Sequence, residues 1–117
     1  MHEVALAQAV WRQVAAEMEK RPGQRLLGLA LVVGRWSGAD PESLEFALGL
    51  VAAESPWPGA KVTTRSEPLR LKCRPCGRGY EPSELNLACP VCGAYDSETL
   101  AGQEVRLESI EIEETPG

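Results

Sequence analysis

The chain has 117 residues, 44% of them hydrophobic, and a formal net charge of −5. This length suits one domain with at most a small appendage. An acidic chain is not typical of a general nucleic-acid binder, and no apolar run approaches the roughly 20 residues of a membrane-spanning helix. The first residues carry no basic segment of the kind that opens a secretory signal. Composition therefore indicates a cytoplasmic protein that binds neither nucleic acid nor a membrane.

Residues 3–20 show the spacing of an amphipathic helix. Its apolar residues recur at alternating steps of three and four: Val4, Ala7, Trp11, Val14 and Met18. The segment RPGQ at 21–24 ends the helix, because proline cannot continue it and glycine permits a turn. The next segment, RLLGLALVVG at 25–34, is short and almost wholly apolar, which predicts a strand covered on both faces.

A second helix is expected to begin at Pro41. Asp40 can cap it, proline suits the first helical position, and Glu42 lies in the first turn. Its expected buried stripe consists of Leu44, Ala47 or Leu48, and Val51. The segment SPWPG at 55–59 ends the helix.

Two extended segments follow. Residues 60–72 read as one of them, in which Pro68 predicts an edge position or a bend. Residues 103–114 alternate apolar and polar side chains, but the phase changes between Leu107 and Ile110, which predicts a β-bulge. The order of elements predicts an α+β fold with two helices on a small mixed three-stranded sheet.

All four cysteines lie between the last two extended segments, in CRPCGRGYEPSELNLACPVC. Cys73 and Cys76 form one C-x2-C pair, and Cys89 and Cys92 form another. Each pair places two thiolates at the tip of a tight turn. Two facing tips supply a tetrahedral set of sulfurs, which is the ligand set of structural zinc. The spacing therefore predicts a zinc-ribbon subdomain inserted into the sheet domain.

Three other uses of the cysteines fit less well. Two disulfides need an oxidising compartment, to which nothing in the sequence directs the chain. A redox C-x-x-C occurs singly, at a helix start in a thioredoxin-like setting. An iron–sulfur cluster can use four cysteines, but paired knuckles at this spacing are typical of zinc. Because four thiolates leave no open coordination position and the chain offers no pairing of nucleophile with base, we expect no catalysis.

A basic stretch at 61–78 offers a rival interpretation. Its cations are Lys61, Arg65, Arg70, Lys72, Arg74 and Arg78. With Tyr80 as a stacking platform, such a stretch suits a zinc-ribbon nucleic-acid-binding or transcription-associated module. The cations that flank the cysteines also offset the formal negative charge of four thiolates on a zinc ion, which accounts for much of the cluster without nucleic acid.

Several stretches together are characteristic of a known family. They are MHEVALAQ at the start, GLALVVGRWSGADPESLEFAL in the middle, the paired C-x2-C, and GQEVRLESIEIEE near the end. In these stretches the chain resembles the HypA/HybF family of hydrogenase-maturation nickel metallochaperones. The resemblance implies a nickel-binding domain of residues 1–71 plus 103–117 and a zinc ribbon of residues 72–102. It implies as partners a nickel-handling GTPase, a hydrogenase large-subunit precursor and, in some members, urease maturation factors.

By the same resemblance, nickel binds at the extreme N-terminus, where His2 is the chain's only histidine. The Met1 amine, the His2 amide nitrogen and the His2 imidazole are consecutive donors, and Glu3 can add its amide or carboxylate. Such nitrogen-rich sets suit Ni(II) or Cu(II) better than zinc. The resemblance also places Asp40 near this site. The expected metals are a transported Ni(II), carried toward a [NiFe] hydrogenase, and a structural Zn(II).

Overall fold

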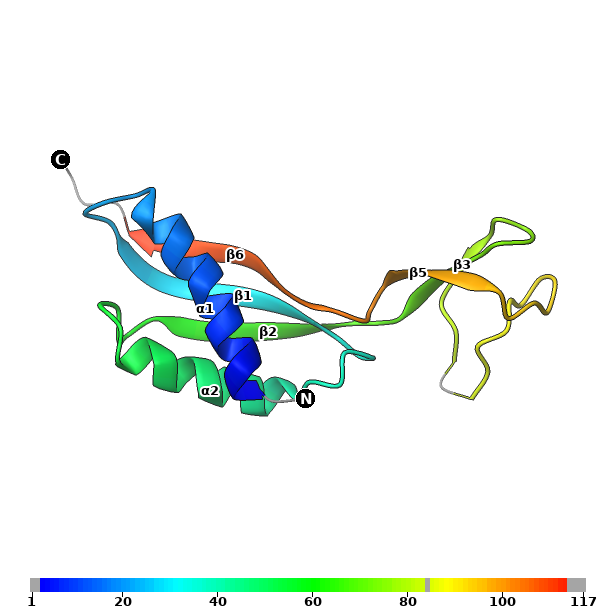
Figure 1. Ribbon diagram of the computed structural model, residues 1–117, viewed down its shortest axis with the longest axis horizontal. Coiled ribbons are helices and arrows are strands. Elements are labelled where there is room, and N and C mark those ends of the chain that lie inside the picture. Colours follow the sequence, from blue (N-terminus) through cyan, green and yellow to red (C-terminus); the bar gives the residue numbers. More distant parts are fainter. Residues whose placement is uncertain (1–2, 84, 114–117) are drawn as a thin grey trace.

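The computed structural model describes residues 3–83 and 85–113, and Figure 1 shows two lobes joined by a narrow waist. The elements are α1 (Glu3–Glu19), β1 (Arg25–Gly34), α2 (Pro41–Ala53), β2 (Lys61–Glu67), β3 (Arg70–Cys73), β4 (Gly79–Tyr80), β5 (Ser97–Ala101) and β6 (Val105–Glu113). The larger lobe contains both helices and the sheet β2-β1-β6, and the ribbon lobe contains the sheet β4-β3-β5. Within the described ranges, no helix has the length and apolar character needed to cross a membrane.

Strand β1 is the centre of the larger sheet. It pairs in parallel with β2 and antiparallel with β6, so the sheet is mixed. A parallel pair needs a crossover connection, and α2 supplies it because it lies between β1 and β2 in the chain. Both helices pack their apolar side chains against β1. The predicted α+β arrangement of two helices on a mixed three-stranded sheet is confirmed.

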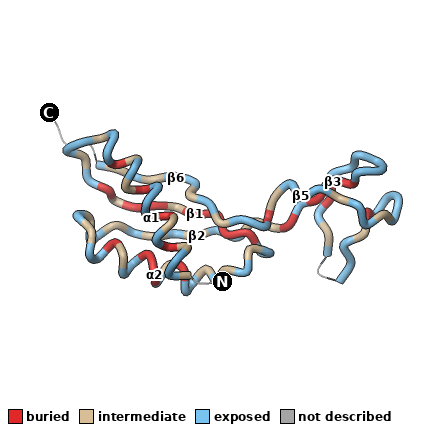
Figure 2. The backbone as a smooth tube through the Cα atoms, viewed as in Figure 1, coloured by how far each residue is buried: buried red, intermediate tan, exposed pale blue. Residues whose placement is uncertain are grey.

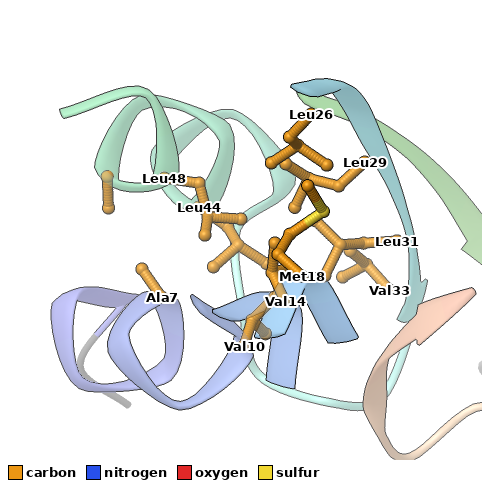
Figure 3. Close-up of a cluster of buried hydrophobic side chains, with 11 residues drawn as sticks. Ala7, Val10, Val14, Met18, Leu26, Leu29, Leu31, Val33, Leu44 and Leu48 are labelled. Atoms are coloured by element: carbon orange, nitrogen blue, oxygen red, sulfur yellow. The ribbon is translucent and has the colours of Figure 1, made fainter. Parts of the chain in front are cut away.

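The core of the larger lobe lies between the two helices and β1 (Figure 3). Its buried residues are Ala7, Val10, Val14 and Met18 of α1, Leu44, Ala47 and Leu48 of α2, and Leu26, Leu29, Leu31 and Val33 of β1. The prediction that Val4 and Val51 belong to the buried stripes of their helices is wrong. Val4 is 63% exposed and Val51 is only half-buried. Both instead line a groove between α1 and α2, because the first turn of α1 faces the other helix.

The predicted bulge is present in β6. Two consecutive residues of β1, Ala30 and Leu31, pair with Ser109 and Leu107 of β6. Glu108 is therefore an extra residue with no partner on β1. The insertion explains the change of phase, because apolar residues on both sides of it pack against the core.

Charged side chains cover β1 on the face away from the helices. Val32 is fully buried there. Arg65 of β2 donates through Nε to both carboxylate oxygens of Glu108 at 3.1 Å, and Arg106 of β6 donates to Glu67 of β2 at 2.7 Å. Since β1 lies between β2 and β6, both ion pairs cross it. These arginine hydrogen bonds lower the pKa of Glu67 and of Glu108.

The extended segment predicted at 60–72 is divided between two sheets. β2 ends at Glu67, and β3 begins at Arg70 in the ribbon lobe. Pro68 lies between them, where the chain leaves the first sheet, so the predicted bend is confirmed. Proline has no amide with which to continue the ladder of β2.

Backbone hydrogen bonds at the end of β1 join the two lobes. The chain passes between the lobes after β2 and again after β5. The amides of Arg35 and Trp36 donate to the carbonyls of Glu67 and Gly102, each at 2.9 Å. The turn after β1 is therefore hydrogen-bonded to both segments that connect the lobes. Gly34 approaches so closely that a Cβ on it would lie 2.3 Å from the carbonyl oxygen of Gly102.

We predict that Gly34→Ala lowers the free energy of unfolding by about 1–3 kcal/mol, because two backbones must separate to admit the methyl group. Urea unfolding measures the change. Gly49→Ala is the matched control: a Cβ at Gly49 meets nothing within 4 Å, and alanine in a helix is more stable than glycine by about 0.5–1 kcal/mol. A Gly34→Ala midpoint equal to that of the wild type would contradict a tight junction.

Candidate metal sites

Two turns of the same design position the cysteines. The amide of Gly77 donates to the carbonyl of Cys73 at 2.8 Å, and the amide of Gly93 donates to the carbonyl of Cys89 at 2.8 Å. Both glycines have a φ of 76°, a region in which other residues are strained. This repeated geometry explains why a glycine follows each C-x2-C pair.

The two turns bring the four cysteine sulfurs together. All four Sγ atoms lie within 4.8 Å of one another. Cys73 and Cys92 are separated by 3.4 Å and Cys76 and Cys89 by 3.7 Å, measured between sulfurs. Four sulfurs arranged as a tetrahedron at about 2.3 Å from a zinc ion lie about 3.8 Å apart. The predicted ligands therefore already have the separation that an S4 metal site needs.

Hydrogen bonding and the closeness of the sulfurs give the thiols of Cys73 and Cys89 different pKa values. The backbone amide of Cys92 lowers the pKa of the Cys89 thiol to about 6. The amide of Cys76 acts in the same direction on Cys73, but burial and the neighbouring sulfurs outweigh it and raise the pKa of Cys73 to about 12. Several thiolates cannot ionise side by side without a compensating charge. A bound dication removes that repulsion, so the cluster suits a metal ion.

The ribbon lobe has little core apart from its cysteines (Figure 2). Its buried cluster consists of Leu69, Leu71, Cys73, Tyr80 and Cys89. The phenol of Tyr80 donates to the carbonyl of Leu87 at 2.9 Å. So small a core does not offset the conformational entropy lost when the ribbon folds. A metal ion that links the two turns would supply the missing folding free energy, and the four cysteines could hold one.

The position of Tyr80 removes the stacking surface that the nucleic-acid interpretation required. Its side chain is only 6% exposed and belongs to the ribbon core. Two cations of the basic stretch also have acidic partners, since Arg65 pairs with Glu108 and Arg74 pairs with Asp96. The basic stretch is thus partly neutralised within the chain, and Tyr80 cannot serve as its aromatic platform.

Of the residues expected to bind nickel, the structure describes only Glu3 and Asp40. Met1 and His2 lie outside the described residues. Glu3 is the first residue of α1, is half-buried, and lines the same groove as Asp40. Glu3 and Asp40, which the family resemblance associated with this site, thus line one groove.

Asp40 is also the cap of α2, as predicted from the sequence. Its Oδ2 accepts hydrogen bonds from the amide of Ser43 at 3.1 Å and from the hydroxyl of Ser43 at 2.7 Å. These bonds lower the pKa of Asp40, so the carboxylate is ionised at neutral pH.

The groove between α1 and α2 was not predicted from the sequence. It encloses about 670 Å³. Its lining residues are Glu3, Val4, Ala7, Asp40, Glu42, Ser43, Phe46, Ala47, Leu50 and Val51. The available signal was the placement of Phe46 and Leu50 outside the buried stripe of α2, one helical turn apart. Large apolar residues on the expected polar face of a helix indicate a surface feature.

Fold and sites together define a small two-lobed metal-binding protein. Residues 1–112 match the family model for hydrogenase/urease nickel incorporation, metallochaperone, HypA. Hydrogenase maturation factor HypA from Picosynechococcus sp. is 32% identical, with 96% of this chain and 99% of the relative covered. The factor of the same name from Synechococcus elongatus is 34% identical, with 96% and 99% covered. The chain belongs to the HypA family.

A solved structure shares the fold. The solution structure of the Ni metallochaperone HypA from Helicobacter pylori aligns with a TM-score of 0.75 over 96% of this chain and 97% of that one. Its sequence identity is 22%, so the likeness supports the fold alone. The resemblance inferred from the sequence is confirmed, as is the α+β fold with a second, cysteine-bearing sheet inserted into it.

We predict that Cys73→Ala or Cys92→Ala unfolds the ribbon lobe and leaves the larger lobe folded, because the larger lobe has its own core. Amide resonances of residues 70–101 should lose their dispersion while those of α1, β1 and α2 keep theirs. Glu98→Gln, an exposed change on β5 of the same lobe, should leave both sets unchanged. A well-dispersed ribbon in the cysteine variants would show that the S4 site is not needed for folding.

Proposed function

We propose that this protein is a nickel carrier that binds Ni(II) through its N-terminus and delivers it for maturation of a [NiFe] hydrogenase. The observation that carries the proposal is the match of residues 1–112 to a family of nickel-incorporation metallochaperones. Two chemically different donor sets in separate lobes support it, since a carrier needs one site for its cargo and can use another for its fold. Moving an ion exchanges only coordination bonds, so the protein is not an enzyme.

Zinc is the proposed ion of the ribbon, held by Cys73, Cys76, Cys89 and Cys92. A closed set of four thiolates leaves no position for water or substrate, so the zinc supplies folding free energy and no chemistry. The sulfur separations support this assignment. Exposed cations beside the turns, Lys72 and Arg78, reduce the net negative charge of the site.

Nickel is the proposed cargo of the N-terminus, with His2 and Glu3 as ligands. The Met1 amine, the His2 amide and the His2 imidazole form adjacent chelate rings around one ion, and a planar nitrogen-rich set of this kind favours Ni(II) over zinc. Asp40 lines the same groove as Glu3 and is ionised, which makes it a candidate for a further contact. A site with few ligands at a chain terminus can release its ion to a partner.

The proposed partners follow from this role. They are a nickel-handling GTPase of hydrogenase maturation, the hydrogenase large-subunit precursor and, as a second route, urease maturation factors. The proposed compartment is the cytoplasm, and neither nucleic acid nor a membrane is a partner. The proposed division of the chain is a nickel-binding domain of residues 1–71 plus 103–117 and a zinc ribbon of 72–102. The second sheet, whose strands lie between Arg70 and Ala101, supports that division.

We predict that His2→Ala weakens Ni(II) binding to the zinc-loaded protein by more than about 100-fold, because it removes a direct ligand. Isothermal titration measures the affinity, and elemental analysis should find one zinc per chain in both proteins. Glu3→Gln should weaken binding less, and Glu19→Gln, at the far end of α1, should have no effect. Unchanged nickel affinity in His2→Ala would rule out the terminal site.

A chain extension distinguishes the amine from a plain imidazole ligand. Adding two residues before Met1 converts the amine into a peptide amide, which binds Ni(II) only after it loses its proton. If the amine is a ligand, the extended protein should bind nickel more weakly or with a different visible absorption spectrum, while its zinc content stays the same. Equal affinity and equal spectra would show that the site consists of His2, backbone amides and Glu3.

A further inference from the structure

The groove between α1 and α2 exposes an unusual set of apolar side chains. Phe46 is 70% exposed, Val4 63% and Leu50 57%, and all three line the groove. Phe46 and Leu50 lie one turn apart on α2, and Val4 faces them from the first turn of α1. Exposed apolar residues that gather in one concave place, instead of being scattered singly, mark an interaction site.

The charge around the groove is of one sign. Its charged lining residues are Glu3, Asp40 and Glu42, and the lining includes no lysine or arginine. Asp40 is hydrogen-bonded to Ser43, whereas Glu3 and Glu42 form no ion pair with any residue in 3–83 or 85–113. Both lie in the first turns of their helices, Glu3 in α1 and Glu42 in α2. The groove thus combines an apolar floor with an acidic rim.

We infer that the groove docks an amphipathic helix of the protein that receives the nickel, with apolar side chains on one face and lysines or arginines beside them. An apolar stripe at helical spacing matches a groove formed by two helices, and basic flanks match Glu3 and Glu42. This inference rests on the proposed carrier function, because it is the cargo next to Glu3 that gives a partner reason to bind here.

A second copy of this chain is the poorer occupant. A two-fold contact through the groove sets the same surface against itself. Glu3, Asp40 and Glu42 of one copy would then face the same three carboxylates of the other, and like charges oppose such a contact. An occupant of opposite charge avoids this repulsion.

The test uses two synthetic helical peptides of about 18 residues, long enough to form a helix on binding. One carries leucines at helical spacing with flanking lysines, and the other has glutamate in place of every lysine. Fluorescence anisotropy measures their affinity for the zinc-loaded protein, and amide chemical shifts locate the contact. We expect the lysine peptide to bind at least about tenfold more tightly and to shift the resonances of α1 and α2.

Pairs of matched variants test which residues contribute to binding of the lysine peptide. Leu50→Ser should weaken the lysine peptide at least about tenfold, whereas Leu100→Ser, an exposed leucine of the ribbon lobe, should not. Glu42→Lys should weaken it and reduce the salt dependence, whereas Glu98→Lys on β5 should not. Circular dichroism checks that each variant is folded.

Three results would overturn the inference. The first is equal affinity of the two peptides, and the second is an equal effect of Leu50→Ser and Leu100→Ser on the affinity of the lysine peptide. The third is self-association of the wild-type protein in sedimentation that Leu50→Ser abolishes, which would assign the groove to a second copy. Nickel titration of Leu50→Ser separates the two proposals. Normal nickel affinity with failed peptide binding removes the docking site alone, and lost nickel binding in His2→Ala with normal peptide binding removes the carrier function alone.

Discussion

The close approach of the Gly34 and Gly102 backbones determines how the two lobes meet. A Cβ on Gly34 would lie 2.3 Å from the carbonyl oxygen of Gly102, and a Cβ on Gly102 would lie 2.5 Å from the Cα of Leu69. Only glycine at these positions lets the turn after β1 donate hydrogen bonds to both crossings. The same turn leads into Asp40, the cap of α2. One backbone contact therefore positions both the ribbon lobe and the helix that forms one wall of the groove.

The two lobes reach stability by different means, and this separates their functions. The larger lobe buries a continuous set of apolar side chains from both helices and β1, and none of its core residues is a cysteine. The ribbon lobe buries a small cluster in which Cys73 and Cys89 take part. A metal bound by the four cysteines would thus be part of the ribbon fold, whereas the core between the helices and β1 needs no metal. The proposed nickel cargo could therefore leave the protein without loss of either lobe.

The sequence predicted the features that follow from periodicity and spacing. The cap at Asp40, the bend at Pro68 and the bulge beside Glu108 each come from local chemistry that the structure confirms. The exposure of Val4 could not be read from spacing, because periodicity identifies a helical face but not the element that this face meets. The groove required knowledge of how α1 crosses α2. The ion pairs over β1 required strand order, since they join strands that are not neighbours.

A metal carrier must hold its ion firmly and still release it to the correct partner. Retention and release place different physical demands on a metal site. An ion held by all four ribbon sulfurs, as proposed, would leave only if the ribbon opened. The proposed nickel donors at the N-terminus are few enough to exchange their ion, but such a site alone does not choose its recipient. The proposed docking groove, which Glu3 lines, would supply the choice, because a docked partner would hold its own ligands close to the ion. Transfer would then be an exchange within one complex, at a high effective concentration, rather than release into solution.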